Sequence, residues 1–115
     1  MTLEECYNAF GGNYRDVLAR LIKEERVERF IKAFPTQDMI GPIEKEIKEK
    51  NYKQAFLDAH TLKGLCATLG ISKLYKSVSD LTEALRGDEI KENPIPLLEI
   101  VKEDYKLTID TIAKL

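Results

Sequence analysis

Residues 52–69 read YKQAFLDAHTLKGLCATL, and the spacing of their small and apolar positions is helical. With about 100° of rotation per residue, one set of these positions falls on a single stripe of the helix. The stripe consists of Ala55, Ala59, Leu62, Cys66 and Leu69. It is typical of a face that packs against other helices. We therefore predict a helix from about Tyr52 to Leu69, with Gly70 as the residue that ends it.

His60, the only histidine of the chain, lies outside this stripe. It is rotated by roughly 130° from the centre of the stripe, which turns it away from the predicted core. Its neighbours on that second face are small or apolar, whereas an exposed helix face usually carries long charged side chains. These neighbours are Leu57, Gly64, Ala67 and Thr68. Two interpretations stay open: a histidine without a function among scattered surface residues, or an accessible imidazole with an apolar rim for a docking partner.

Gly64 lies one helical turn after His60, inside the helix, where glycine costs about 0.5–1 kcal/mol relative to alanine. The missing side chain lets another protein approach the imidazole, although close packing of a second helix of the same protein is an alternative use. Lys63 lies three residues after His60 and can place an ammonium group beside an anion held on the ring. An imidazole that is nucleophilic near neutral pH, a nearby cation and free space together predict a carrier of phosphoryl groups.

The stretch from Ala59 to Gly70, AHTLKGLCATLG, resembles a His-x-x-Lys-Gly signature. This signature belongs to the histidine-containing phosphotransfer (HPt) domains of bacterial phosphorelays. The similarity continues less sharply through Leu74 and through residues 81–87, LTEALRG. The resemblance implies an all-α fold, an up-and-down antiparallel four-helix bundle with an additional short N-terminal helix or helices. We expect a single domain over residues 1–115. The sequence favours a stand-alone form but leaves open whether the domain belongs to a larger protein.

The resemblance also implies roles for the residues around His60. His60 is then the phosphoryl acceptor, and Nε2 is the ring nitrogen that we favour, although the sequence does not assign it. Lys63 helps to balance the phosphoryl charge. Thr82 lies where members of the family often have a polar residue near the phosphoryl group, and the sequence leaves its contribution open. The remaining residues of the face shape the docking surface for a receiver domain, and they are Gly64, Leu57, Ala67 and Thr68.

The function that follows is that of a phosphorelay intermediate. His60 accepts a phosphoryl group from an aspartate of a response-regulator receiver domain and passes it to another receiver. The expected partners are such a receiver domain and a hybrid histidine kinase. We expect no cofactor on this chain, because the acidic pocket and the Mg²⁺ belong to the partner receiver. The alternative function is a helical adaptor that docks receivers or other signalling partners without carrying phosphate.

The rest of the chain is also helical in its periodicity, and no segment shows the alternation typical of a strand. We predict a short helix over residues 2–10 ended by Gly11-Gly12, and then a helix capped by Asn13. The apolar face of this second helix is Val17, Leu18, Leu21 and Ile22. The apolar face then changes side, so a separate helix follows from about residues 23–24 to Pro35. Its apolar face is Val27, Phe30, Ile31 and Phe34.

Three more helices complete the prediction. One runs over about residues 38–50 with Gly41-Pro42 in its first turn, the next is capped by Ser72 and closed by Gly87, and the last follows Pro94 and Pro96. Their inward residues are Ile40, Ile43 and Ile47 in the first, Leu74, Val78, Leu81 and Leu85 in the second, and Leu98, Val101, Tyr105, Ile109 and Ile112 in the third. Several antiparallel helices with short connections predict an up-and-down bundle.

Composition excludes several classes of function. The chain has 115 residues, of which 43% are hydrophobic and 33% charged, and a formal net charge of −2. The net charge argues against a nucleic-acid-binding protein, which usually carries a basic patch. No apolar run approaches the roughly 18 residues of a membrane-spanning helix. Residues 1–12 contain neither basic residues nor an apolar block, so they are not a signal peptide.

The numbers and positions of cysteine and histidine exclude further kinds of site. One histidine and the two distant cysteines, Cys6 and Cys66, cannot form a tetrahedral zinc site. We expect no disulfide between the cysteines and a location in the reducing cytoplasm. The chain has no glycine-rich nucleotide-binding loop, so it should not phosphorylate itself from ATP. We therefore expect a monomeric phosphocarrier, not an enzyme.

Overall fold

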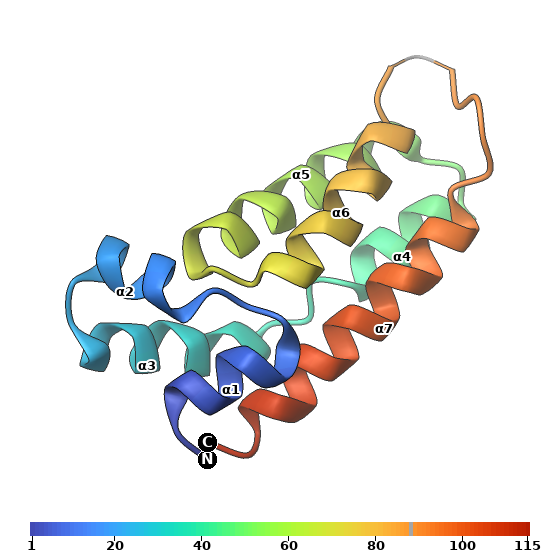
Figure 1. Cartoon of the computed structure of the whole chain (residues 1–115). Coiled ribbons are helices and arrows are strands. Elements are labelled where there is room, and N and C mark those ends of the chain that lie inside the picture. The colour runs from blue at the N-terminus through green and yellow to red at the C-terminus, as the bar shows by residue number, and fades with distance from the viewer. Residues whose placement is uncertain (88) are drawn as a thin grey trace.

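Seven α-helices and one short 3₁₀-helix make up the protein, and no strand occurs in the residues that the computed structural model describes, 1–87 and 89–115 (Figure 1). The all-α prediction is confirmed. The α-helices are α1 (Leu3–Phe10), α2 (Tyr14–Leu21), α3 (Glu24–Ala33), α4 (Gly41–Lys48), α5 (Tyr52–Leu69), α6 (Ser72–Ala84) and α7 (Ile95–Ile112), and the 3₁₀-helix is η1 (Phe34–Thr36).

The helix α5 packs against both α4 and α6, and α6 packs in turn against α7. These four helices lie side by side, and successive ones run in opposite directions along the long axis of the molecule (Figure 1). The inward stripes of α5 and α6 are buried as predicted, and they meet the buried residues of α4 and α7 in one core. The three N-terminal helices gather at the end where α5 finishes and α6 begins (Figure 1).

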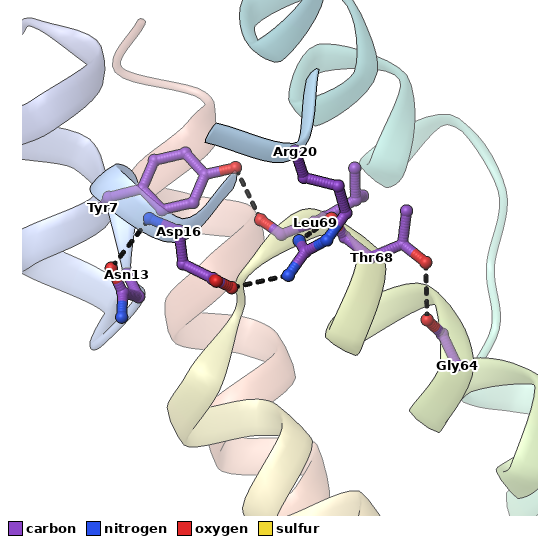
Figure 2. A network of polar contacts seen from close by, with 7 residues as sticks. All are labelled: Tyr7, Asn13, Asp16, Arg20, Gly64, Thr68 and Leu69. Carbon is purple, nitrogen blue, oxygen red and sulfur yellow. Dashed lines mark hydrogen bonds and ion pairs between the residues drawn. The ribbon is translucent and has the colours of Figure 1, made fainter. Parts of the chain in front are cut away.

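The C-terminal end of α5 is covered by the N-terminal helices, so its last carbonyl groups need donors from the protein (Figure 2). Gly70 has a left-handed φ of 69°, and Ile71 N–H donates to the carbonyl of Cys66 at 3.0 Å. This is the usual way in which a glycine ends a helix. Three more carbonyls are satisfied from residues 7–20. The donors are Arg20 Nη1 to Thr68 O at 2.6 Å, Tyr7 OH to Leu69 O at 2.7 Å, and Asn13 N to Gly70 O at 2.9 Å.

The predicted apolar face of α2 was wrong at its last residue. Ile22 is 73% exposed, and its backbone has a left-handed φ of 72°. A β-branched residue rarely adopts this conformation. Here Ile22 N–H donates to Leu18 O at 2.7 Å, which closes α2, and the turn then directs α3 back along the molecule. Phe30 in α3 is also largely outside the core, with 43% exposure.

The predicted N-cap of α6 was wrong by one residue. Ser72 is the first residue of the helix, and Ile71 occupies the cap position without a side-chain hydrogen bond. The backbone of the α1–α2 turn replaces the side-chain cap, because Lys73 N–H donates to Gly11 O at 3.0 Å. The Ile71 side chain is fully buried, so the residue at the cap position packs in the hydrophobic core and does not cap the helix.

Both cysteines are buried thiols and form no disulfide, as predicted. Burial raises the pKa of Cys66 to about 12 and raises the pKa of Cys6 as well, so neither thiol has thiolate character near neutral pH. Within residues 1–87 and 89–115, no helix combines the length and the apolar character needed to cross a membrane.

The Tyr7 hydroxyl offers a test of the contact between α1 and α5. Tyr7→Phe should lower the free energy of unfolding by about 1 kcal/mol, because the buried Leu69 carbonyl loses its donor. Tyr14→Phe is the matched control, since its hydroxyl donates to the exposed Glu24 carboxylate at 3.1 Å. The control should stay within about 0.5 kcal/mol of the parent. Urea unfolding of both variants measures the difference, and equal losses would contradict the importance of the α1–α5 hydrogen bond.

Candidate functional site

His60 lies on the solvent-facing side of α5. The stripe of Ala55, Ala59, Leu62, Cys66 and Leu69 is buried on the other side of the same helix, whereas His60 is exposed. The orientation predicted for this helix is therefore confirmed. Leu57, on the same face as His60, is 50% exposed.

Open space surrounds Gly64. A Cβ atom placed on this glycine would have no neighbour within 4 Å outside its own helix backbone. No second helix packs closely against Gly64, so the alternative use of this glycine, close packing inside the protein, is wrong. The space beside His60 is available to a partner molecule.

Ala67 and Thr68 continue the exposed face toward the end of α5. The Thr68 hydroxyl donates to Gly64 O at 3.0 Å, and the Thr68 carbonyl accepts from Arg20 at 2.6 Å (Figure 2). Arg20 also pairs with Asp16 at 2.6 Å. The face that carries His60 is thus continuous with polar side chains of α2, which sequence reasoning did not include. No periodic pattern within α5 could indicate this neighbour.

Lys63 is half-buried and lies three residues after His60, so the two side chains are neighbours on α5. Hydrogen bonds from Arg86 lower the pKa of the Glu83 carboxyl group, and the positive charge of Lys63 lowers it further. Thr82 does not join Lys63 and His60: it is fully buried, and its hydroxyl donates to Val78 O at 2.7 Å within α6.

Three side chains that lead in contact from α6 to His60 had no assigned role in the sequence reasoning: Glu83, Arg86 and Phe56. The Phe56 and His60 rings have centroids 6.0 Å apart and are tilted by 42°. Arg86 Cζ lies 5.0 Å from the centroid of the Phe56 ring. Arg86 also donates to both carboxylate oxygens of Glu83, at 3.1 and 3.0 Å. The spacing of Phe56 four residues before His60 was the only signal in the sequence, because the α6 residues become neighbours through packing.

A carboxyl pair between α4 and α5 lies on a different side of α5. Loss of hydration, followed by a hydrogen bond and charge repulsion from Asp58, raises the pKa of Glu46 to about 7. One Glu46 oxygen is buried without a partner among the described residues. Asp58 accepts a further hydrogen bond from Gln54 Nε2 at 3.2 Å. These contacts belong to the α4–α5 packing and not to the His60 face.

One hollow of the surface, about 430 Å³, is lined in part by Phe56, whose ring neighbours that of His60. Another, about 480 Å³, is lined by residues of α4 and α7 and their flanks, and no residue of α5 contributes to it. A smaller one, about 270 Å³, lies where α2, α5 and α6 meet and shares Ala67 with the His60 face. Within the described part of the chain, no three histidine, cysteine or carboxylate side chains gather as metal ligands would. The arrangement offers an exposed nucleophile with a nearby cation.

Comparison with known protein families gives one match. The family model described as Hpt domain matches residues 24–111, which run from the start of α3 almost to the end of α7 and include His60, Lys63 and Gly64. No curated protein and no solved structure matches the chain. The helices α1 and α2 lie outside the matched range. The match covers well over half of the sequence, and the chain therefore belongs to the Hpt domain family, whose members carry phosphoryl groups on a histidine in phosphorelays.

Proposed function

We propose that this protein is a phosphorelay intermediate that accepts a phosphoryl group on His60 from a receiver-domain aspartate and passes it to another receiver. The observation that carries the proposal is the exposed position of the only histidine, on a helix face with open space at Gly64. The protein acts as a carrier and has no kinase activity of its own. Its partners are a response-regulator receiver and a hybrid histidine kinase.

The transfer step requires a neutral imidazole. The lone pair of one ring nitrogen attacks the phosphorus of the aspartyl phosphate, and an N–P bond forms. The P–O bond to the aspartyl carboxyl group breaks, and the carboxylate leaves with that electron pair. The other ring nitrogen keeps its proton. The reverse step on a second receiver restores the neutral imidazole, so the carrier is unchanged after one cycle.

The two partners divide the chemistry between them. The receiver supplies the acidic pocket and the Mg²⁺ that stabilise the transferring group, and this chain binds no cofactor. Lys63 adds positive charge beside the phosphoryl group on His60. Gly64 leaves room for the receiver, and the rest of the docking surface consists of Leu57, Ala67 and Thr68. The protein contributes mainly an oriented nucleophile, so positioning accounts for much of the rate.

Our proposal also concerns the helices that carry this docking surface, which we infer to form the bundle typical of the family. We propose that α4, α5, α6 and α7 are its four helices, in an up-and-down antiparallel order, and that the N-terminal helices close one end. The contacts of α5 with α4 and α6, and of α6 with α7, support this arrangement. We also propose a monomer in the cytoplasm, since two buried free thiols fit a reducing compartment.

His60→Gln should abolish phosphoryl transfer and leave the fold intact. His60 is exposed, so its replacement should change the free energy of unfolding by no more than about 0.5 kcal/mol. Label transfer from a ³²P-phosphorylated receiver and the thermal midpoint are measured on the same preparation. The label on the parent chain should be acid-labile and alkali-stable, as expected of phosphohistidine. A variant that still takes up label would contradict the role of His60, and receiver binding without any labelling of the parent would favour the adaptor function.

Lys63→Ala should slow transfer without preventing receiver binding. Lys63 is only half-buried, so the effect of its charge on the phosphoryl group is partly screened by solvent and should grow as ionic strength falls. Single-turnover rates across a salt series measure this effect. Lys76→Ala in α6 is the control, because its exposed side chain pairs only with Asp80 in the described structure, at 3.3 Å. If the Lys63 and Lys76 variants behave alike at every salt concentration, Lys63 has no part in the transfer.

Gly64→Ala should stabilise the protein by up to about 1 kcal/mol while it slows transfer, because a side chain enters the space used by the receiver. Gly64→Gln should fold normally and lose most of the transfer rate. Gly70→Ala is the contrasting control: its φ is 69°, and a Cβ there would lie 3.0 Å from Asn13 O. That variant should be destabilised. Thermal midpoints and transfer rates test all three, and a Gly64→Gln protein with full transfer would remove Gly64 from the docking surface.

A further inference from the structure

A row of side chains ends at the reactive histidine: Glu83 from α6, Arg86 from the segment just after α6, then Phe56 and His60 from α5. We propose that Phe56 is a positioning residue for the His60 imidazole, and that Arg86 fixes Phe56 in turn. The inference rests on the proposed phosphotransfer function. It adds a residue on the same helix that determines how the nucleophile is presented.

The contact between the two rings has the geometry of an attractive aromatic pair. Their centroids are 6.0 Å apart and their planes are tilted by 42°, within the range of tilted aromatic contacts. The spacing of four residues on α5 places the two side chains on adjacent turns. Within the described residues, the imidazole makes no hydrogen bond, so Phe56 is the observed contact that limits its rotation. An exposed histidine without such a contact would sample several rotamers.

Phe56 is itself held on two sides. It is half-buried and packs against the hydrophobic core, which restricts its ring. The guanidinium of Arg86 lies over the ring at 5.0 Å, a distance typical of a cation–π contact. Arg86 in turn donates two hydrogen bonds to the Glu83 carboxylate, at 3.1 and 3.0 Å. A planar guanidinium bound to a carboxylate through two parallel bonds has little freedom left.

The same contacts argue against a direct role of Arg86 as a second cation for the phosphoryl group. Its charge is compensated by Glu83, and two of its N–H groups are already used. Hydrogen bonding to Glu83 raises the pKa of Arg86. Arg86 therefore acts through Phe56, whereas Lys63 remains the cation near the phosphoryl group.

The benefit of a fixed imidazole is entropic. A receiver that docks on α5 meets a nitrogen already directed outward, so less rotational freedom is lost in the transition state. Removing the ring should lower the rate of transfer within the docked complex. It should not change the affinity of docking.

The first experiment separates positioning from docking and from stability. The probe is the ³²P-phosphorylated receiver domain that labels the parent chain, used at increasing concentration in single-turnover measurements. Phe56→Leu keeps an apolar side chain without a ring, and its maximal rate should fall about tenfold while the half-saturating receiver concentration stays unchanged. Phe56→Tyr keeps the ring and should transfer at close to the parent rate. A rise in half-saturation alone, or an unchanged maximal rate for the leucine variant, would overturn the inference.

The chain provides a matched control. Phe30 in α3 is also a partly exposed phenylalanine with an arginine over its ring, Arg29 at 5.2 Å. Phe30→Leu should leave the maximal rate unchanged. Thermal midpoints are recorded for both leucine variants, and if both lose rate in proportion to their loss of stability, the effect is structural and the inference falls.

The second experiment examines Arg86 and the imidazole itself. If Arg86 fixes Phe56, Arg86→Lys and Arg86→Gln should lower the maximal transfer rate to the same extent, because lysine lacks the planar group that stacks on the ring and pairs with the carboxylate. A parent-like rate in Arg86→Lys would show a simple charge effect and contradict the inference. In proton NMR spectra, the His60 ring resonances should shift in Phe56→Leu and stay in place in Phe30→Leu. Unshifted resonances in Phe56→Leu would exclude the ring contact. A parent chain that takes no label contradicts the proposed function instead, and the positioning role falls with it.

Discussion

The last turn of α5 ends beneath other parts of the chain, and this constraint governs the rest of the structure. A helix end that is covered must have its free carbonyl groups satisfied by the protein. Here Arg20, Tyr7 and the backbone of Asn13 supply the donors. These hydrogen bonds join the end of α5 to the N-terminal helices, while the buried stripe of α5 turns the opposite face, with His60, to solvent. Residues outside the family match therefore help to hold the helix that carries His60.

The two faces of α5 meet different requirements. The buried face uses small side chains at Ala55, Ala59 and Cys66, which let α4 and α6 approach closely. The exposed face has few charges, because a docking protein must be able to cover it. A regular helix is a rigid support for a reactive side chain, so the site needs neither a cleft nor a loop that closes over it. Most of the remaining chemistry can reside in the partner.

The features of the sequence that depend on one segment alone were predictable. The bounds of α5, its buried stripe and the closing Gly70 follow from periodicity and glycine chemistry within that segment. The errors occurred where another segment decides the outcome. Ser72 has the chemistry of a helix cap, but the helix begins at Ser72 itself, and the Gly11 carbonyl from another segment accepts the Lys73 N–H of its first turn. Ile22 is apolar and correctly spaced, yet no count of apolar residues reveals a left-handed backbone.

The residues of the candidate site likewise include some that one segment alone predicts and others that depend on a second segment. His60 and Gly64 could be identified because both lie in one helix and their spacing is visible in the sequence. The stacking of Arg86 on Phe56 was not predictable, since it depends on the register between α5 and α6. Nothing in either helix alone specifies which residue of the neighbour will lie beside Phe56.

The links between the N-terminal segment and the end of α5 have a consequence for how the chain folds. Tyr7 and Leu69 are separated by 62 positions, whereas α5 and α6 follow each other through a two-residue turn. Closing a long loop costs more chain entropy than closing a short one, so local helix pairs form first. We expect α5 and α6 to pair early and the N-terminal helices to dock late, in the step that completes the end of α5. During synthesis the N-terminal helices emerge first but must wait for their binding surface.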